Sequence, residues 1–494
     1  MHKSIKLYNR QQVYQLDQLA MTEDGFSSKQ LMGQAAMAVW HSIQRRWPDI
    51  KRVIMLAGCG NNGGDAFALA SILKKAGLAV ELLSVGDLSG QSDEAREFRE
   101  SWEQQGGLTQ PWQGTCPDCD LIVDGLLGIG LDRQLDENWI SMIEVINKMN
   151  AVRVSIDIPS GLNADSGIAM PVAIIADLTV TFIGRKAGCF VADGPDYCGE
   201  IDFDALGLSG ASAAKLPAFC KLLDTYNITL PAVRKNNSYK NQFGHVLVIG
   251  GGQSMSGAVR LAGMAALRCG AGLVSLCVHP ANVIAAASHH AELMVSDWNA
   301  LDDTLKLATV IVVGPGLGQS PAAQQILIKL IDIDKPMVID ADALQTQFLN
   351  SLSLKNCVIT PHPGEAARLL QLTSQQVQQD RIVSLQKLNK LWPAVSVLKG
   401  AGSLVGKQNK IVKLCLHGHA GMATAGMGDV LSGMIAAYLA QGLTTLKAAQ
   451  SGVLVHALAA EYFAREQDAS SLIASDVIER VSLVVRDIRH LQRD

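Results

Sequence analysis

Short apolar runs alternate with helical patterns along most of the chain. In the first half, runs typical of buried strands cover residues 52–58, 79–86, 119–128, 151–161 and 176–184, and glycine, proline or an acid follows each apolar core. Between the first two runs, the spacing of Ala, Leu and Ile over residues 65–77 predicts an amphipathic helix that ends at Gly77. This order of strand, turn, helix and strand is typical of a parallel α/β sheet.

A second series of the same kind begins after a break in the pattern. The stretch 216–241 is rich in proline, asparagine and basic side chains. Afterwards apolar runs resume at 244–252, 273–280, 308–318, 336–344, 356–370 and 394–406, with a helix predicted over 256–272. We therefore predict an α/β fold class with two domains, 1–216 and 241–494, joined by a linker at 217–240.

Composition restricts the class of partner. The chain has 494 residues, of which 48% are hydrophobic and 18% charged, and its net charge of −4 comes without long basic runs. This argues against nucleic acid or membrane as the main partner and favours small molecules. Ten scattered cysteines and the lack of a signal-peptide pattern predict a cytoplasmic location. The one C-x-x-C pair, Cys116 and Cys119, has no partners at zinc spacing and is interpreted as chance.

Polar side chains follow several of the predicted strands. The segment GNNGGD, residues 60–65, offers backbone N–H groups at a helix N-terminus, which suits a phosphate. The oxygens of Asn62, Asp124 and Ser160 could converge on a hard cation. A glycine-rich turn alone is a weak signal, because glycine also serves turns with positive φ. Several polar strand ends together favour a ligand site, since open α/β sheets bind ligands there.

A single acid, Asp429, stands among five glycines in residues 418–433, directly before an apolar helical pattern. A helix-capping role would explain the acid but not the run of glycine before it. The glycines indicate that a bound group comes close to the backbone at this turn.

These motifs resemble two known families. NNGGD, DGLLGIGL and DIPSGLNADSG, in that order, resemble the NAD(P)HX epimerase family. HVLVIGGG, VGPGLG, TPHPGEAARLL, LKGAGSLV and GMATAGMGDVLSG resemble the ADP/ATP-dependent NAD(P)HX dehydratase family. Together they resemble the fused NAD(P)H-hydrate repair enzymes of bacteria over nearly the whole chain. The resemblance implies a Rossmann-like epimerase domain followed by a ribokinase-like dehydratase domain.

For the first half, the resemblance implies interconversion of the R and S epimers of hydrated NADH and NADPH (NADHX and NADPHX), with Asp157 as an acid/base group. A turn-capping role for Asp157 stays open. Potassium ligands are expected at Asn62, Asp124 and Ser160. Substrate contacts are expected at Asn61, Asn62, Gly63, Gly64, Asp65, Gly128, Ile129, Gly130, Leu131, Asp132, Arg133, Gln134 and Asp157.

For the second half, the resemblance implies an anion hole formed by the N–H groups of Gly426 to Asp429, with Asp429 as the base in phosphoryl transfer. Magnesium is expected with ADP or ATP, and ADP is favoured. Substrate contacts are expected at Ala258, Gly316, Gly318, His362 and Asp429. Nucleotide contacts are expected at Lys399, Gly400, Ala401, Gly402, Ser403 and Gly428.

Some positions depart from the family pattern and leave alternatives open. Cys59 and Ala66 differ in the first half, and His417, His419 and Met427 leave the nucleotide pocket in doubt. A small-molecule kinase could use the same anion hole, and the first half could be a non-catalytic ligand-binding module. An oxidoreductase is less favoured, because no G-x-G-x-x-G with a later acid follows the first strand. A homo-oligomer without nucleic-acid or membrane partners is expected.

Overall fold

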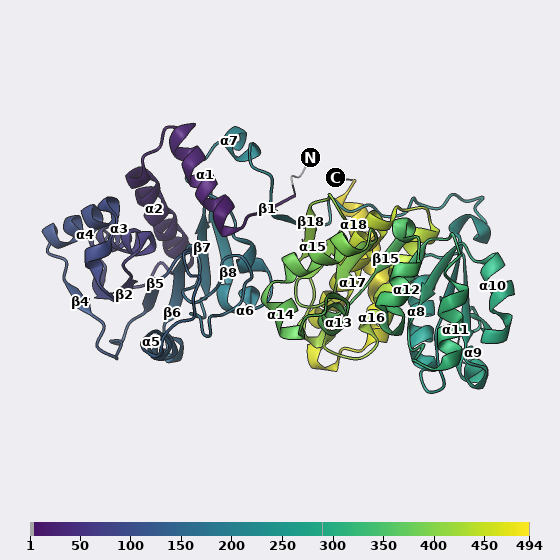
Figure 1. Cartoon of the computed structure of the whole chain (residues 1–494). Coiled ribbons are helices and arrows are strands. Elements are labelled where there is room, and N and C mark those ends of the chain that lie inside the picture. The colour runs from purple at the N-terminus through teal and green to yellow at the C-terminus, as the bar shows by residue number, and fades with distance from the viewer. Residues whose placement is uncertain (1–3, 289, 494) are drawn as a thin grey trace. The chain divides into compact units, whose positions relative to one another are not determined.

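The protein, seen here as a computed structural model that describes residues 4–288 and 290–493, divides into two compact units (Figure 1). One unit is Lys6–Cys220, and the other is Lys221–Asp494 together with Met1–Ile5. Each unit contains a largely parallel sheet with helices around it, which confirms the α/β fold class.

The sheet of the first unit is parallel throughout. A topological switch point lies between β2 and β5, because the chain adds strands on one side of β2 before it crosses to the other. In spatial order the strands are β4 (Thr109–Pro111), β3 (Ala79–Ser84), β2 (Arg52–Ala57), β5 (Leu121–Gly125), β6 (Val152–Ile156), β7 (Leu178–Phe182) and β8 (Glu200–Asp204). The helices are α1 (Arg10–Thr22), α2 (Ser28–Arg46), α3 (Asn61–Lys75), α4 (Asp93–Gln104), α5 (Glu137–Lys148), α6 (Gly194–Cys198) and α7 (Gly210–Ala214).

Both faces of this sheet are covered, as its uninterrupted apolar strands predict. Val53 and Met55 of β2 join the core beneath α2 and α3. The alternate residues Ile54 and Leu56 join the core beneath α5. Successive side chains of a strand point to opposite faces, so one apolar strand serves two cores.

Helix α3 begins at Asn61, four residues before the predicted start at Asp65. The glycines that read as a turn lie in its first turn, and none of them has a positive φ. A Cβ at Gly63 would lie 2.0 Å from the Gly58 carbonyl oxygen, and one at Gly64 would lie 2.7 Å from the Met32 sulfur. Close packing, rather than backbone conformation, therefore requires glycine here.

The second unit has a larger sheet, in which β16 pairs antiparallel with β17 and β17 pairs antiparallel with β18. In spatial order its strands include β18 (Val412–Cys415), β17 (Ser403–Gly406), β16 (Val395–Leu398), β15 (Cys357–Ile359), β14 (Met337–Ile339), β13 (Val310–Val313), β10 (His245–Ile249), β11 (Leu273–Val278) and β12 (Met294–Asp297). The helices are α8 (Ser256–Arg268), α9 (Val283–Ala287), α10 (Leu301–Leu307), α11 (Pro321–Lys329), α12 (Thr346–Ser351), α13 (Pro363–Leu370), α14 (Ser374–Gln379), α15 (Arg381–Leu391), α16 (Met427–Ala440), α17 (Thr445–Glu466) and α18 (Ala474–Leu491).

Helix α16 is the most buried helix of this unit and packs closely against its neighbours. A Cβ at Gly433 would lie 2.0 Å from the carbonyl oxygen of Ala262 in α8. A Cβ at Gly452 of α17 would lie 2.7 Å from the Ile435 side chain. Small residues at both contacts let three helices approach, which fixes the N-terminus of α16 at the carboxyl edge of the sheet.

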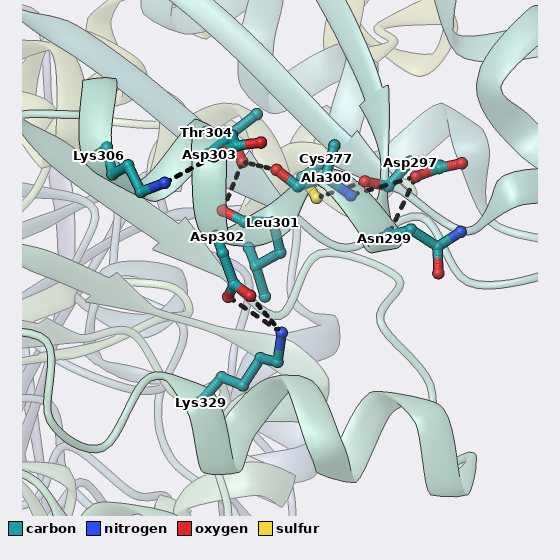
Figure 2. Close-up of polar contacts among 10 residues, drawn as sticks. All are labelled: Cys277, Asp297, Asn299, Ala300, Leu301, Asp302, Asp303, Thr304, Lys306 and Lys329. Atoms are coloured by element: carbon teal, nitrogen blue, oxygen red, sulfur yellow. Dashed lines mark hydrogen bonds and ion pairs between the residues drawn. The ribbon is translucent and has the colours of Figure 1, made fainter.

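The outer edge of this sheet is held by exposed polar contacts (Figure 2). Asp297, at the end of β12, accepts hydrogen bonds from the backbone N–H groups of Asn299 at 2.9 Å and Ala300 at 3.3 Å. Lys329 of α11 forms an ion pair with Asp302 of α10 at 2.9 Å. These acids cap and join short helices, so they have a structural role.

The predicted linker is in part packed against the second unit. Leu223 and Ile228 are 5% and 6% exposed and belong to its main apolar core. Nearby, the Ser451 hydroxyl donates to the Thr229 carbonyl at 2.8 Å. The segment from Lys221 therefore contributes to the stability of this unit.

We predict that the two units fold separately when each is expressed alone, and that the second is more stable when it starts at Lys221 than at Asn241. The shorter fragment would expose the core positions that Leu223 and Ile228 cover, at about 1.5 to 3 kcal/mol for each side chain. Urea unfolding of both fragments measures this difference. Insoluble single units would refute the separation, and equal midpoints would refute the role of the segment.

Candidate functional site

The first unit has a cavity of about 700 Å³ at its switch point. It is lined from the carboxyl ends of β2, β5, β6 and β7 and from α1. Of the residues predicted to contact substrate, the cavity brings together Asn61, Asn62, Asp65, Gly128, Ile129, Gly130, Leu131, Asp132, Arg133 and Asp157. Gly63 and Gly64 lie inside the first turn of α3, and Gln134 lies on the exposed surface outside the cavity.

Asp157 has a strained backbone and a buried cationic partner. Its φ is 68°, in the left-handed region that non-glycine residues rarely adopt. Its carboxylate forms an ion pair with Lys186, whose side chain is 1% exposed, and accepts the Phe182 N–H at 3.1 Å. The Lys186 ammonium also donates to the Phe182 carbonyl at 2.9 Å. Such strain persists where surrounding contacts fix the residue, which is typical of functional sites.

Two further carboxylates share this lysine. Burial raises the pKa of Asp17 to about 6, with Lys186 lowering it and Asp157 raising it. Burial, then Asp157 and Asp17, raise the pKa of Asp65 well above its usual value. One ammonium cannot neutralise three half-buried carboxylates, so protons stay in the site near neutral pH.

Sequence reasoning missed Asp17 and Lys186. Both lie far in sequence from the motif that contains Asp157. The one signal for Asp17 was its position beside the apolar face of α1, where Val13, Leu16 and Ala20 are core residues.

The predicted potassium ligands also converge. Asp124 is 1% exposed and accepts hydrogen bonds from the Ser155 hydroxyl at 2.8 Å, the Ser160 N–H at 2.8 Å and the Ser160 hydroxyl at 2.5 Å. The amide of Asn62 and the Ser160 hydroxyl both reach the Leu127 carbonyl oxygen, each at 3.2 Å. Burial raises the pKa of Asp124 despite these bonds.

Within residues 4–288 and 290–493, no cationic side chain forms an ion pair with Asp124. A buried carboxylate surrounded by a hydroxyl, an amide and a carbonyl oxygen fits a cation of low charge. Potassium at these oxygens stays a prediction from sequence.

The second unit places a helix N-terminus beside a buried ion pair. Helix α16 begins after Gly426, which has φ of 88° and a cap without a side-chain hydrogen bond. The first N–H groups of a helix have no partner within it, so those of Met427, Gly428 and Asp429 can serve an anion. A Cβ at Gly428 would lie 3.2 Å from the Lys399 ammonium nitrogen, so the glycine keeps this space open.

Lys399 joins the acids of this site. Its ammonium nitrogen lies 2.6 Å from an Asp340 oxygen and 3.8 Å from a Glu365 oxygen. The Ser432 hydroxyl donates to the other Asp340 oxygen at 2.7 Å. Burial lowers the pKa of Lys399, but the Asp340 and Glu365 carboxylates outweigh it and raise that pKa overall.

Asp429 has a pKa suited to a general base near neutral pH. Burial raises the pKa of Asp429 to about 7, the Asp340 carboxylate adds to the shift, and Lys399 opposes it. Asp342, another contributor, accepts the Gly318 N–H at 2.8 Å. Ala341, between the two acids, has φ of 48°, so strain marks this site too.

The remaining predicted substrate contacts lie on three loops and helices. Gly316 lies against α8, because a Cβ there would be 3.3 Å from the Ala258 side chain. His362 caps α13: its Nδ1 accepts the Gly364 N–H at 3.0 Å, and its Nε2 lies 3.3 Å from a Glu365 oxygen. The ring is 56% exposed, so part of it faces solvent, while Nδ1 caps the first turn of the helix.

Arg381 stabilises the predicted nucleotide loop, residues 399–403, through hydrogen bonds to backbone carbonyls. This arginine is 2% exposed, and its guanidinium donates to the carbonyls of Leu398, Lys399 and Gly402 at 3.3 to 3.4 Å. A Cβ at Gly400 would lie 2.8 Å from the same guanidinium. Sequence reasoning missed Arg381, together with Asp340 and Glu365.

The departures from the family pattern have local partners. Nδ1 of His417 lies 3.0 Å from Glu461, which also accepts the Gly418 N–H at 3.0 Å. His419 accepts the Gly421 N–H at 3.1 Å, and Met427 is 8% exposed. In the first unit, Ala66 is fully buried, while Cys59 is exposed at the cavity.

Within the part of the chain that the structure describes, no three His, Cys, Asp or Glu side chains are placed to hold a metal ion. In the same part of the chain, no helix has the length and apolar character needed to cross a membrane.

Residues 28–188 match the family model described as YjeF-related protein N-terminus, and residues 246–482 match the one described as NAD(P)H-hydrate dehydratase. The bifunctional NAD(P)H-hydrate repair enzyme of Coxiella burnetii is 37% identical, with 97% of this chain and 99% of that one covered. The Escherichia coli enzyme of the same name is 36% identical, covering 93% and 90%.

Among solved structures, the ADP/ATP-dependent NAD(P)H-hydrate dehydratase of Bacillus subtilis, co-crystallised with ATP and Mg²⁺, has 26% identity and a TM-score of 0.47. The match covers 53% of this chain and 95% of that one. Two family models cover the two units in order, and curated relatives align along nearly the full chain. The chain therefore belongs to the family of bifunctional NAD(P)H-hydrate repair enzymes.

Proposed function

We propose that this chain repairs hydrated NADH and NADPH, with an epimerase site in the first unit and a nucleotide-dependent dehydratase site in the second. The observation that carries the proposal is that each unit has its own cluster of buried acids around one lysine at the carboxyl ends of its strands. Within residues 4–288 and 290–493, no two cysteines form a disulfide, which supports the predicted cytoplasmic location. The homo-oligomer stays a prediction from sequence.

In the epimerase, the reacting carbon has a hydroxyl and is bonded to the ring nitrogen. A protonated carboxyl, Asp65 or Asp17, gives its proton to the hydroxyl, the C–O bond breaks, and the nitrogen lone pair stabilises the cation that forms. Water then adds to the other face, and a carboxylate takes its proton. Asp157, which Lys186 holds at the cavity through an ion pair, is that carboxylate in our proposal.

We predict that Asp157→Asn slows epimerisation by about two to four orders of magnitude, since an amide cannot accept the proton. Chromatography of the two epimers after mixing measures the rate. Asp49→Asn, on the exposed loop before β2 and away from the cavity, is the control and should match the wild type. Dehydration by the other unit should be unchanged in both. An unchanged epimerisation rate in Asp157→Asn would assign the residue to the turn alone.

Potassium in the first unit would be held by Asp124 and Ser160, with oxygens of Asn62 and Leu127 around them. When bound, it supplies a positive charge that fixes the loops around the substrate. The chain's part is to keep these oxygens converged, which it does through hydrogen bonds from neutral groups to Asp124.

We predict that Asp124→Asn removes the activation of epimerisation by potassium and lowers the rate in saturating potassium by at least about tenfold, because the ligand charge is lost. Rates in potassium and in sodium chloride of equal ionic strength separate ion binding from screening. Asp118→Asn, an exposed position shortly before the same strand, is the control. A full potassium response in Asp124→Asn would rule out this ion site.

In the dehydratase, a phosphoryl group passes from the nucleotide to the hydroxyl of the hydrated ring, whose proton goes to Asp429. Phosphate is a better leaving group than hydroxide, so the lone pair of the ring nitrogen then expels it and the dihydropyridine returns. The N–H groups at the start of α16 and the Lys399 ammonium stabilise the transferring group.

Magnesium would arrive with the nucleotide and be held mainly by phosphates and water, as is usual for this ion. Asp340 and Glu365 are the carboxylates beside Lys399 that could reach its coordination shell. Residues 399–403, supported by Arg381, would bind the nucleotide. ADP rather than ATP as the donor stays a prediction.

We predict that Asp429→Asn lowers the dehydration rate by about two to four orders of magnitude and leaves epimerisation unchanged. In the wild type, the rate should rise with pH through about 7, because the base acts only when deprotonated and the pKa of Asp429 is about 7. Return of the reduced-nicotinamide absorbance, followed across pH, checks both.

Asp332→Asn, a change of the same kind outside the site, is the control for this experiment. Dehydration within about threefold of the wild type, well short of general-base loss, would leave Asp429 as a helix cap only. A stable phosphorylated product without return of reduced cofactor would favour the small-molecule kinase.

A further inference from the structure

The second unit has another cavity, of about 580 Å³, where α8, α16 and α18 end beside the segment 231–234. It is strongly basic. Among the described residues that line it, none is acidic. Five arginines and one histidine can carry a positive charge there: Arg234, Arg268, Arg486, Arg489, Arg493 and His490.

Most of these positive charges have no carboxylate partner. Arg486 forms an ion pair with Asp487 at 2.8 Å, and in the described chain the other four arginines form none. Arg234 donates to the Gly270 carbonyl at 2.7 Å, and Arg489 donates to the Pro231 carbonyl at 3.0 Å. Neutral partners orient these groups without cancelling their charge.

The floor of the cavity contains two buried donor groups. The Tyr438 side chain is 1% exposed, and the neighbour of its hydroxyl is the Cys269 thiol, a weak hydrogen-bond partner. Nε of Arg489 is buried and has no hydrogen-bond partner within the described residues. A ligand oxygen is a stronger acceptor than a thiol and would satisfy such groups better.

Helix ends alone do not account for this surface. The C-terminus of a helix is partly negative and attracts cations, which explains Arg268 on α8 and Arg489 on α18. Arg234 and Arg493 lie outside the helices, and a helix dipole does not accept hydrogen bonds from Tyr438. An additional group is needed to satisfy both the charge and the donors.

We propose that this cavity binds a small anionic metabolite with two or more phosphate groups. Several guanidinium groups around one cavity match phosphate oxygens in geometry and charge, and the volume is that of a small-molecule site. The cavity is distinct from the nucleotide site. That site lies at the start of α16 and this one at its end, about 20 Å away at 1.5 Å per residue over 14 residues.

The test is protection of single arginines in the full-length protein from phenylglyoxal, located by peptide mass spectrometry. Inorganic pyrophosphate should protect Arg234 and Arg268 and leave Arg465, exposed on α17, reactive. Inorganic phosphate should protect at higher concentration. Equal protection by potassium chloride of matched ionic strength would mean screening alone and overturn the proposal. Protection only by a single-stranded RNA oligomer would overturn it in favour of a macromolecular partner.

Variants make the test specific to the cavity. Arg268→Met with Arg493→Met removes two exposed arginines and should raise the pyrophosphate concentration for half-protection of Arg234 by at least about tenfold. Tyr438→Phe should raise it by about threefold. Lys355→Met with Lys390→Met removes the same charge from exposed positions elsewhere in the unit and should change it by less than about twofold. Equal shifts in the arginine and lysine variants would overturn the proposal.

Discussion

A buried lysine among carboxylates is the interaction on which each site depends. Lys186 is 1% exposed and pairs with Asp157, and Lys399 pairs with Asp340 in the second unit. An unpaired ammonium group could not stay buried, and neither could the acids around it. Each lysine faces more acids than it can neutralise, so one carboxyl titrates near neutral pH in each site. The pKa of Asp17 is about 6 and that of Asp429 is about 7.

The sheet provides the convergence that these ion pairs need. Lys399 directly follows β16 and Asp340 directly follows β14, so both side chains start at the same edge. A residue of positive φ marks each site. In the second unit it is Ala341, which follows Asp340, and in the first unit it is Asp157 itself. The close packing of α16 against α8 then brings Asp429 to the same edge.

Local sequence could predict much of this arrangement, and long-range contacts explain the rest. Apolar runs predicted β2, β5, β6 and β7 to within a few residues, because a buried parallel strand is apolar along its whole length. The start of α3 was wrong by four residues, since its glycines serve packing against Met32 and Gly58 rather than a turn. That reason exists only in the tertiary structure.

The same division holds for the candidate sites. Asp124 and Asp429 lie in motifs whose neighbours have unusual composition, so a local pattern could identify them. Asp17 and Arg381 lie on helices outside the quoted motifs, so only their partners across the fold set them apart. Glu365 lies within the TPHPGEAARLL motif, but only its place beside Lys399 shows its role. His362 shows the converse, because its motif predicts a ligand contact while half of its ring caps α13. The role of its exposed edge stays a prediction.

The first unit buries negative charge in two different ways within one sheet. Asp157 has a lysine, whereas Asp124 on the neighbouring strand region has only hydroxyl and N–H donors. Hydrogen bonds from neutral groups stabilise a carboxylate without adding a positive charge, so the Asp124 cluster carries at most one negative charge. Divalent cations in oxygen sites usually take more carboxylates than this. The ion proposed for this place would therefore meet at most one charge among neutral oxygens, whereas Asp157 already has Lys186 as its cationic partner.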